Sequence, residues 1–197
     1  INLQSSVEYL FANAQNYTVG LTVSDGFCTD ISYANIVVYE EPVITLTPTD
    51  LTCYQSSDGI IFVERQGGNP GFSYSWLNLT NNKTESSSRS DETYEIFALD
   101  AGEYIVTVYS SECQVTDFVT ITEPEPFTIT TSEIHPTCYG VADGSMLSGA
   151  NGSNAGTPYS YLWTKLPPSG ITYTGSDQLN SIPAGDYEIE ATDGKGC

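Results

Sequence analysis

The feature that most constrains the fold is an internal repeat with a period of about 84 residues. Short motifs from the middle of the chain return further along it at nearly constant spacing. The matching pairs are Cys53 and Cys138, Asp58-Gly59 and Asp143-Gly144, Trp76 and Trp163, Ala101-Gly102 and Ala184-Gly185, Tyr104 and Tyr187, and Cys113 and Cys197. Tyr17 and Cys28 match Tyr104 and Cys113 in the same way. Self-similarity at a fixed period is typical of one structural unit repeated along a chain.

This period divides the 197 residues into three parts. Residues 1–42 are predicted to be the C-terminal part of a first repeat, and residues 43–125 a complete repeat. Residues 126–197 are predicted to be a third repeat that lacks its last strand. We therefore expect the sequence to be a portion of a longer array.

The complete repeat has the alternating pattern of β-strands. In Phe72-Ser73-Tyr74-Ser75-Trp76 the rings lie on one face of a strand and the serines on the other. Strands are predicted at residues 43–47, 60–63, 72–76, 94–99, 104–109 and 115–122, with ragged strands in the polar stretch 78–91 and no helix longer than a turn. About seven short strands in such a length are typical of an immunoglobulin-type β-sandwich. The predicted fold class is all-β, with tandem immunoglobulin-like sandwiches arranged head to tail.

Five aromatic residues are assigned to packing. Trp76 and Trp163 are predicted to be core residues, because strand alternation places them on the buried face. The tyrosine of Gly-x-Tyr before the sixth strand is typical of a tyrosine corner, in which the hydroxyl bonds to an upstream backbone group. Tyr104, Tyr187 and the matching Tyr17 are assigned to this role.

The charge of the chain excludes two classes of partner. There are 25 acidic residues against 5 basic ones, giving a formal net charge of -20. Such a surface repels phosphate backbones and anionic lipid, so we expect no nucleic-acid partner. No apolar run reaches about 18 residues, so we expect no membrane insertion.

Calcium is the one candidate cofactor. The A–B and E–F loops of an immunoglobulin-type sandwich lie at the same end as the exit to the next domain. The acidic residues expected there are Asp58, Asp100, Glu123, Glu125 and, from the F–G turn of the next repeat, Asp193. Oxygen-only clusters suit Ca²⁺. The alternative is that these acids are solvated turn residues, since Asp58-Gly59 needs no metal to form a turn.

The five cysteines, Cys28, Cys53, Cys113, Cys138 and Cys197, indicate disulfides in an oxidising compartment. Pairing within a repeat would join Cys53 with Cys113 and Cys138 with Cys197. However, the A–B connection and the F–G turn lie at opposite ends of a sandwich, separated by roughly 23 Å for about seven residues. A disulfide needs Cα atoms within about 7 Å. The favoured pairing therefore joins Cys53 to Cys197 of the next repeat, and the pairing within repeats stays as the alternative.

Several motifs together resemble the SprB-type repeats of Bacteroidota gliding adhesins. They are Cys138-Tyr139-Gly140-Val141-Ala142-Asp143-Gly144-Ser145, Pro158-Tyr159-Ser160-Tyr161-Leu162-Trp163, Ala184-Gly185-Asp186-Tyr187, Gly196-Cys197 and Val119-Thr120-Ile121-Thr122-Glu123-Pro124. Residues 1–42, through the stretch 16–26, equally resemble the end of a PKD-type domain. The complete repeat departs from the pattern at Ser57 and at Ser111-Glu112-Cys113, where Asn-Gly-Cys is usual.

The resemblance implies a very long, non-catalytic surface protein of the bacterial cell, exported by type IX secretion and displayed as an extracellular filament. Its partners would be neighbouring repeats of the same chain, with surface polysaccharide or other cell-surface proteins as ligands. The expected role is a stiff stalk for adhesion and gliding motility.

The alternative function is a set of accessory or carbohydrate-binding modules of a large secreted enzyme, with Tyr54, Tyr139 or Tyr173 as an exposed binding ring. No catalytic residue is expected in the chain itself. The single histidine, His135, precedes Pro136 and has no counterpart in the complete repeat.

Overall fold

The computed structural model describes residues 8–111, 113–154, 158–168 and 170–197. These residues form fifteen β-strands and no helix, which confirms the all-β fold class. None of the described segments is therefore a helix that could cross a membrane. The contacts divide the chain into two compact units. The first contains Ile1–Thr47, Phe62–Glu95 and Glu103–Val119, and the second contains Pro48–Ile61, Ile96–Gly102 and Thr120–Cys197.

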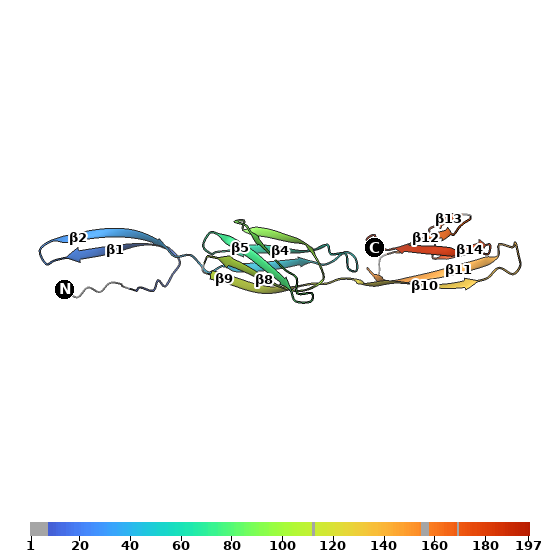
Figure 1. The fold of residues 1–197 in the computed structure, drawn as a ribbon, viewed down its shortest axis with the longest axis horizontal. Coiled ribbons are helices and arrows are strands. Elements are labelled where there is room, and N and C mark those ends of the chain that lie inside the picture. Colours follow the sequence, from blue (N-terminus) through green and yellow to red (C-terminus); the bar gives the residue numbers. More distant parts are fainter. Residues whose placement is uncertain (1–7, 112, 155–157, 169) are drawn as a thin grey trace. The chain divides into compact units, whose positions relative to one another are not determined.

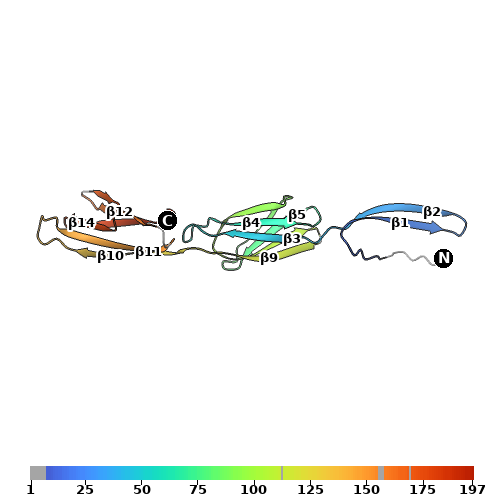
Figure 2. The ribbon, with the colours of Figure 1, turned by 180° about the vertical axis from the view of Figure 1, so that it is seen from behind.

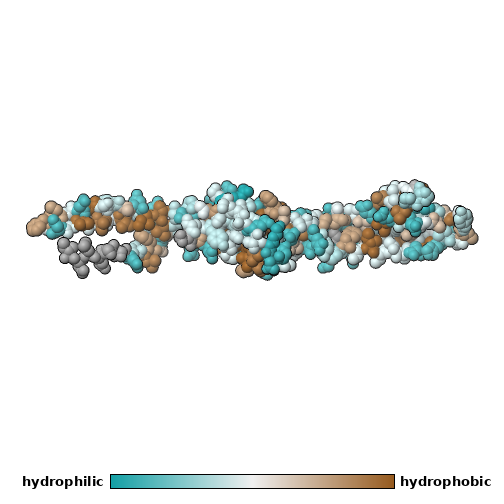
Figure 3. Space-filling view, in the orientation of Figure 1, coloured by the Kyte–Doolittle hydropathy of each residue, from teal (hydrophilic) through white to brown (hydrophobic). Residues whose placement is uncertain are grey.

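The first strands form a two-stranded hairpin. Strand β1 (Asn16–Ser24) pairs antiparallel with β2 (Thr29–Val37), from Asn16 opposite Val37 to Ser24 opposite Thr29. Apolar side chains such as Leu21 and Tyr33 are exposed on it, and brown apolar surface follows the hairpin in Figure 3. The tight turn between the two strands carries Cys28.

Residues 43–121 form two sheets with the strand order of an immunoglobulin-like sandwich (Figures 1 and 2). One sheet has the order β3-β4-β7 and the other the order β6-β5-β8-β9. The bounds are β3 (Val43–Thr49), β4 (Gly59–Gln66), β5 (Phe72–Asn78), β6 (Thr84–Ser88), β7 (Thr93–Leu99), β8 (Gly102–Ser110) and β9 (Cys113–Ile121). With the strands lettered in chain order, these sheets are A-B-E and C′-C-F-G.

The core of this sandwich follows from strand alternation. Phe72, Tyr74 and Trp76 of β5 are buried, and the serines between them are half-buried. Val106 and Val108 of the neighbouring strand β8 have no exposed surface. The predicted serine face is thus the outer side of the strand, and the aromatic face points inward.

Residues 125–192 repeat this strand order within the second unit. One sheet has the order β10-β11-β14 and the other β13-β12-β15, which correspond to A-B-E and C′-C-F. The bounds are β10 (Glu125–Ile134), β11 (Gly144–Ser153), β12 (Ser160–Lys165), β13 (Thr172–Thr174), β14 (Gln178–Ile182) and β15 (Tyr187–Thr192). Among the described residues of this segment there is no seventh strand.

Trp163 is the centre of the core of residues 125–192. It is 1% exposed and packs with Leu179 and Ile182. Its ring nitrogen Nε1 donates to the Ser176 carbonyl over 3.0 Å, so the polar edge of the ring is satisfied inside the core. Tyr173 packs against the same cluster.

Two of the assigned tyrosine corners make the same hydrogen bond. The Tyr17 hydroxyl donates to the Asn13 carbonyl over 2.9 Å, and the Tyr187 hydroxyl donates to the Pro183 carbonyl over 2.9 Å. Both bonds span four residues. Burial, with a smaller contribution from Tyr173, raises the pKa of Tyr187. The third tyrosine, Tyr104, is buried at the start of β8.

The division into two units passes through the strands of residues 43–121. The second unit therefore combines all of residues 125–197 with one end of the preceding sandwich, including its A–B loop. The three domains predicted from the period, 1–42, 43–125 and 126–197, stay a prediction.

Candidate functional site

The A–B loop of the complete repeat, residues 51–59, is here called the Cys53 loop. The Asp58 carboxylate accepts from the Thr52 backbone N–H over 3.0 Å and also from the Ser56 hydroxyl. Hydrogen bonds from the Ser56 hydroxyl, then from the Thr52 hydroxyl and the Thr52 N–H, lower the pKa of Asp58 to about 2. The Ser56 N–H donates to the Cys53 carbonyl, which closes the turn. The loop thus holds its cysteine in place with hydrogen bonds of its own.

The second element is the end of the chain after β15, residues 192–197, here called the Cys197 turn. Asp193 is 5% exposed, and its Oδ1 accepts from the backbone N–H groups of Lys195 and Cys197 over 2.8 and 3.0 Å. Its other oxygen, Oδ2, accepts from the backbone N–H and the side-chain Nδ2 of Asn154. The buried carboxylate is therefore surrounded by donors, as a charge in a protein interior requires.

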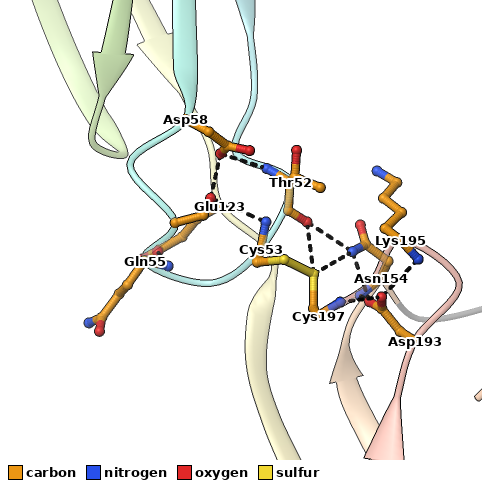
Figure 4. Close-up of a disulfide and its surroundings, with 10 residues drawn as sticks. Thr52, Cys53, Gln55, Asp58, Glu123, Asn154, Asp193, Lys195 and Cys197 are labelled. Carbon is orange, nitrogen blue, oxygen red and sulfur yellow. Dashed lines mark hydrogen bonds between the residues drawn. A yellow bond between two sulfur atoms is a disulfide. The ribbon is translucent and has the colours of Figure 1, made fainter.

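A disulfide joins the two elements (Figure 4). Cys53 and Cys197 are 144 residues apart in the sequence, and their Cα atoms are 5.6 Å apart. Asn154 adds a second link, because its Nδ2 also donates to the Thr52 carbonyl over 2.9 Å. The structure thus brings together the two cysteines of the pairing favoured from the sequence, and both lie in the second compact unit.

The other three cysteines, Cys28, Cys113 and Cys138, are exposed thiols with no disulfide. The alternative pairing within repeats, of Cys53 with Cys113 and Cys138 with Cys197, is not the one formed in the structure.

The A–B loop of the third segment, residues 136–144, is here called the Cys138 loop and repeats the build of the Cys53 loop. Asp143 accepts from the Thr137 N–H over 2.9 Å and from the Thr137 hydroxyl over 2.6 Å. These bonds, the hydroxyl first, lower the pKa of Asp143. The Val141 N–H donates to the Cys138 carbonyl over 3.2 Å, as Ser56 does in the first loop.

Both loops need a backbone with positive φ two residues after the cysteine. Gln55 has φ of 57° and Gly140 has φ of 82°. Glycine adopts this conformation without steric cost, whereas a side chain there is strained. The two loops therefore share this turn despite different residues, and they differ two residues further on, where Ser57 has φ of 53° and the matching Ala142 has no positive φ.

Four of the five acidic residues named as calcium candidates accept hydrogen bonds from protein groups. Asp58 and Asp193 accept the bonds described above, and Asp100 accepts from the Ser57 hydroxyl. Glu123 accepts from the Gln55 N–H over 2.8 Å. Across the parts of the chain that the structure describes, no three acidic, histidine or cysteine side chains lie close enough together to hold a metal ion. Glu125, the fifth candidate, therefore belongs to no such group. The hydrogen bonds of Asp58 and Asp193 stabilise turns, and calcium binding by the candidate residues stays a prediction.

The aromatic candidates for carbohydrate binding lie in different surroundings. Tyr173 packs in the core beside Trp163. Tyr54 and Tyr139 are exposed, each on its own A–B loop. His135 is exposed just before the Cys138 loop.

Asn154 is the residue of this site that the sequence analysis missed. A signal for it was present, since Gly-x-Asn-x-Gly occurs at residues 67–71 and again at residues 152–156. In the complete repeat, the matching Asn69 donates to the Ser111 hydroxyl over 3.2 Å. In both repeats this asparagine therefore contacts the F–G turn of its own repeat.

The strand order and these paired loops define the class of the protein, which is a set of immunoglobulin-like β-sandwich modules. Residues 45–81 match the family model of the SprB repeat. The resemblance seen in the sequence is therefore confirmed for this stretch.

Other comparisons are more distant. No curated protein matches the chain. Among solved structures, two tandem V-type regions of the chitin-binding protein VCBP3 align with a TM-score of 0.29 and 13% identity, over 80% of this chain and 95% of that one. An amphioxus IgVJ-C2 molecule aligns with a TM-score of 0.25 and 15% identity, over 78% and 95%. Both TM-scores lie below 0.5, so the immunoglobulin-like assignment rests on the strand order.

Proposed function

We propose that the chain is a non-catalytic segment of a bacterial cell-surface adhesin, in which disulfides between successive repeats make a stiff stalk. The observation that carries the proposal is the Cys53–Cys197 bond. In terms of the sequence period, it joins the A–B loop of the repeat 43–125 to the F–G turn of the repeat 126–197. A structural bond in this position restricts the movement of one repeat against the next.

The connections between repeats support the same role. Proline fixes φ and reduces the bending of a linker. Pro42 lies before β3, and Pro124 and Pro126 lie at the start of β10. Asp50 Oδ1 accepts from the Thr122 N–H, and the Leu51 N–H donates to the Thr122 carbonyl, so the strand that leaves the repeat is bonded beside the Cys53 loop. A stalk built in this way transmits force through short, fixed connections.

The match to the SprB repeat supports a place on the cell surface, since such repeats occur in surface adhesins. We further propose export by type IX secretion, a source among Bacteroidota, and a part in gliding motility. The ligands would be surface polysaccharide or other cell-surface proteins. The excess of acidic residues keeps such a surface soluble and excludes binding through phosphate backbones.

Small-angle X-ray scattering of the oxidised chain tests the stalk. We expect the scattering of a rod with a narrow range of bend angles, and a wider range in Cys53→Ser. Cys138→Ser is the matched control and should scatter as the wild-type chain. Scattering of the oxidised wild-type chain as freely tumbling modules would contradict the proposal.

A further inference from the structure

Strand β4 places a cation on its buried face. The inward positions before it, Ile61 and Val63, have no exposed surface, and Arg65 is only 7% exposed. The guanidinium stacks on the ring of Phe72, with its carbon Cζ 3.4 Å from the ring centre. Across the residues that the structure describes, Arg65 forms no ion pair with a carboxylate, although acidic residues outnumber basic ones by 25 to 5. A buried charge without a countercharge is unfavourable, so the position of Arg65 requires an explanation.

One edge of this guanidinium lacks good hydrogen-bond partners. Nη1 donates to the Gly67 carbonyl over 2.9 Å. Nη2 reaches the Asp91 carbonyl only at 3.5 Å, the limit for a hydrogen bond, and that carbonyl already accepts from the Tyr74 hydroxyl over 2.9 Å. Nε is buried and has no partner among the described residues. Nε and Nη2 form one side of the planar fork, and this side matches the two oxygens of a carboxylate.

The third segment forms the equivalent loop without this charge. At the period of the repeat, Ala150 matches Arg65 and Gly152 matches Gly67. The Gly152 carbonyl accepts from the Tyr159 hydroxyl over 3.0 Å, so a neutral group takes the place of Nη1 in the same bond. The guanidinium is therefore not required to hold the loop between β4 and β5. A role in binding accounts for its charge and for its open donors.

A cavity of about 380 Å³ lies beside this side chain. It is lined by Arg65 and Phe72, by Pro70 and glycines of the loop between β4 and β5, and by Ser90 and Glu92 of the loop before β7. All of these residues belong to the first compact unit. The volume lies at the lower end of the range for ligand pockets, which suits one small group such as a sugar ring. Ser90 and Glu92 are exposed and can bond to hydroxyl groups, Glu92 as an acceptor.

The cavity lies apart from the surface at which the disulfide joins two loops. In the third segment that surface is formed by Asn154 and the Cys197 turn. The matching residues of the complete repeat are Asn69 and Cys113, and neither of them lines the cavity. The cavity is therefore a feature of this repeat itself.

We propose that this cavity, here called the Arg65 pocket, binds a uronic acid of an acidic polysaccharide. The sugar carboxylate displaces the Asp91 carbonyl from Nη2 and then accepts from Nη2 and Nε, while Tyr74 keeps that carbonyl bonded. Ser90 and Glu92 bond to the ring hydroxyls, which an acidic peptide side chain does not offer. The net charge of -20 opposes a dense polyanion, so the polysaccharide that fits has uronic acids separated by neutral sugars. The ligand class rests on the proposed function, which names surface polysaccharide as a ligand.

NMR titration of the full oxidised chain with methyl glucuronide tests the pocket. Methyl glucoside is the neutral control, since it has the same ring and lacks the carboxylate. We expect the Nε–H signal of Arg65 to shift together with the amide signals of Gly67 and Gly71. The glucuronide should bind about tenfold more tightly than the glucoside, because only the glucuronide forms charge-assisted hydrogen bonds.

Substitutions separate the fork from charge in general. Arg65→Met removes the donors, keeps a side chain that packs on Phe72, and should lose the preference for the glucuronide. Arg65→Lys keeps the charge without the fork and should bind the glucuronide more weakly than the wild-type chain. Lys83→Gln removes a cation that pairs with Glu85 in the same repeat and should keep the preference. Tryptophan fluorescence checks the fold of each variant, and the wild-type Nε–H shift decides if Arg65→Met does not fold.

Four results would overturn the inference: no binding of the glucuronide, equal binding of the two sugars, a preserved preference in folded Arg65→Met, or tighter binding of N-acetylglutamate α-amide, which represents an acidic peptide. None of them affects the stalk, which is tested by scattering and by the Cys53–Cys197 peptide. If that peptide is absent and the glucuronide still binds at Arg65, the proposed stalk fails and the pocket stands.

Discussion

The Cys53 loop and the Cys138 loop are two copies of one local design in different states. In both, an aspartate carboxylate accepts a hydrogen bond from a threonine N–H, and the chain turns at a residue of positive φ. Only the first is joined by a disulfide in the structure, to the Cys197 turn. The hydrogen bonds that shape the loop are thus local and do not depend on docking.

This difference indicates which interactions stabilise the contact between the Cys53 loop and the Cys197 turn. Because the free loop keeps its shape, little ordering of the loop is needed when a partner binds. The stabilisation specific to this contact then comes from the disulfide and from Asn154. Asp58 and Asp143 stabilise only the loops that contain them. Each of these contributions can be measured against its counterpart in the other loop.

The largest effect is expected from removing the disulfide. Cys53→Ser should lower the free energy of unfolding of the second compact unit by about 2–4 kcal/mol, because the bond restricts a long segment of the unfolded chain. Cys138→Ser changes the equivalent cysteine of the Cys138 loop and should leave this free energy unchanged. Chemical denaturation followed by tryptophan fluorescence measures both. Equal effects of the two substitutions would show that the loops do not differ as described.

Asn154→Ala should have the next largest effect. The substitution removes the bonds from Nδ2 to the Thr52 carbonyl and to the buried Asp193 carboxylate. Loss of these bonds should cost about 1–3 kcal/mol. Asn69→Ala is the matched control, since Asn69 Nδ2 bonds the exposed Ser111 hydroxyl, and it should cost less.

The rate at which a small thiol reduces the disulfide gives a second readout for Asn154. We expect faster reduction in Asn154→Ala, because the Cys197 turn loses its link to the Thr52 carbonyl. An unchanged rate would mean that Asn154 stabilises its own repeat and not the junction.

A smaller effect is expected in the pH dependence of the stability that the loop aspartates contribute. The folded pKa of Asp58, about 2, lies below the usual value of about 3.9 for an unfolded chain. Its contribution to stability is therefore complete above that usual value and is lost as the pH falls through the folded pKa. The pKa of Asp143 is lowered by the same kind of donor.

Carboxyl titration by NMR should find both pKa values below the usual range, before and after reduction of the disulfide. Persistence after reduction is expected because the donors Ser56 and Thr52 belong to the loop itself. A return of the Asp58 pKa to its usual value on reduction would mean that docking shapes the loop.

No effect is expected from calcium. The candidate carboxylates Asp58, Asp100, Glu123 and Asp193 already accept hydrogen bonds from protein donors. Thermal unfolding in calcium and in chelator should coincide. A rise in the melting temperature with calcium would mean that these acids bind the ion and that the junction has a further contribution.

Much of the fold could be predicted from the sequence, because strand alternation is a local property. The stretch 72–76 became β5 (Phe72–Asn78), and the stretch 94–99 became β7 (Thr93–Leu99). Within the polar stretch 78–91, a regular strand formed at β6 (Thr84–Ser88). It pairs edge to edge with β5, with Ser86 opposite Ser75 and Ser87 opposite Tyr74. The backbone of the neighbouring strand therefore stabilises a strand that the polar pattern of these residues does not indicate.

The site was less accessible to sequence reasoning. The period and the geometry of a sandwich were enough to favour Cys53 with Cys197. The repeated Gly-x-Asn-x-Gly marks Asn154 as a residue of interest, but the motif does not predict its bond to the carbonyl of Thr52, 102 residues away in the sequence. The acidic residues were grouped by the end of the sandwich they occupy, but whether each would have a local donor depended on loop conformation.

The most direct test of the account is a peptide map of the oxidised, non-reduced chain by mass spectrometry. The central claim is that the disulfide joins two different repeats. The account predicts a linked peptide pair that contains Cys53 and Cys197, with Cys113 recovered outside that pair. A linked pair of Cys53 with Cys113, or of Cys138 with Cys197, would contradict it, because the bond would then lie within one repeat.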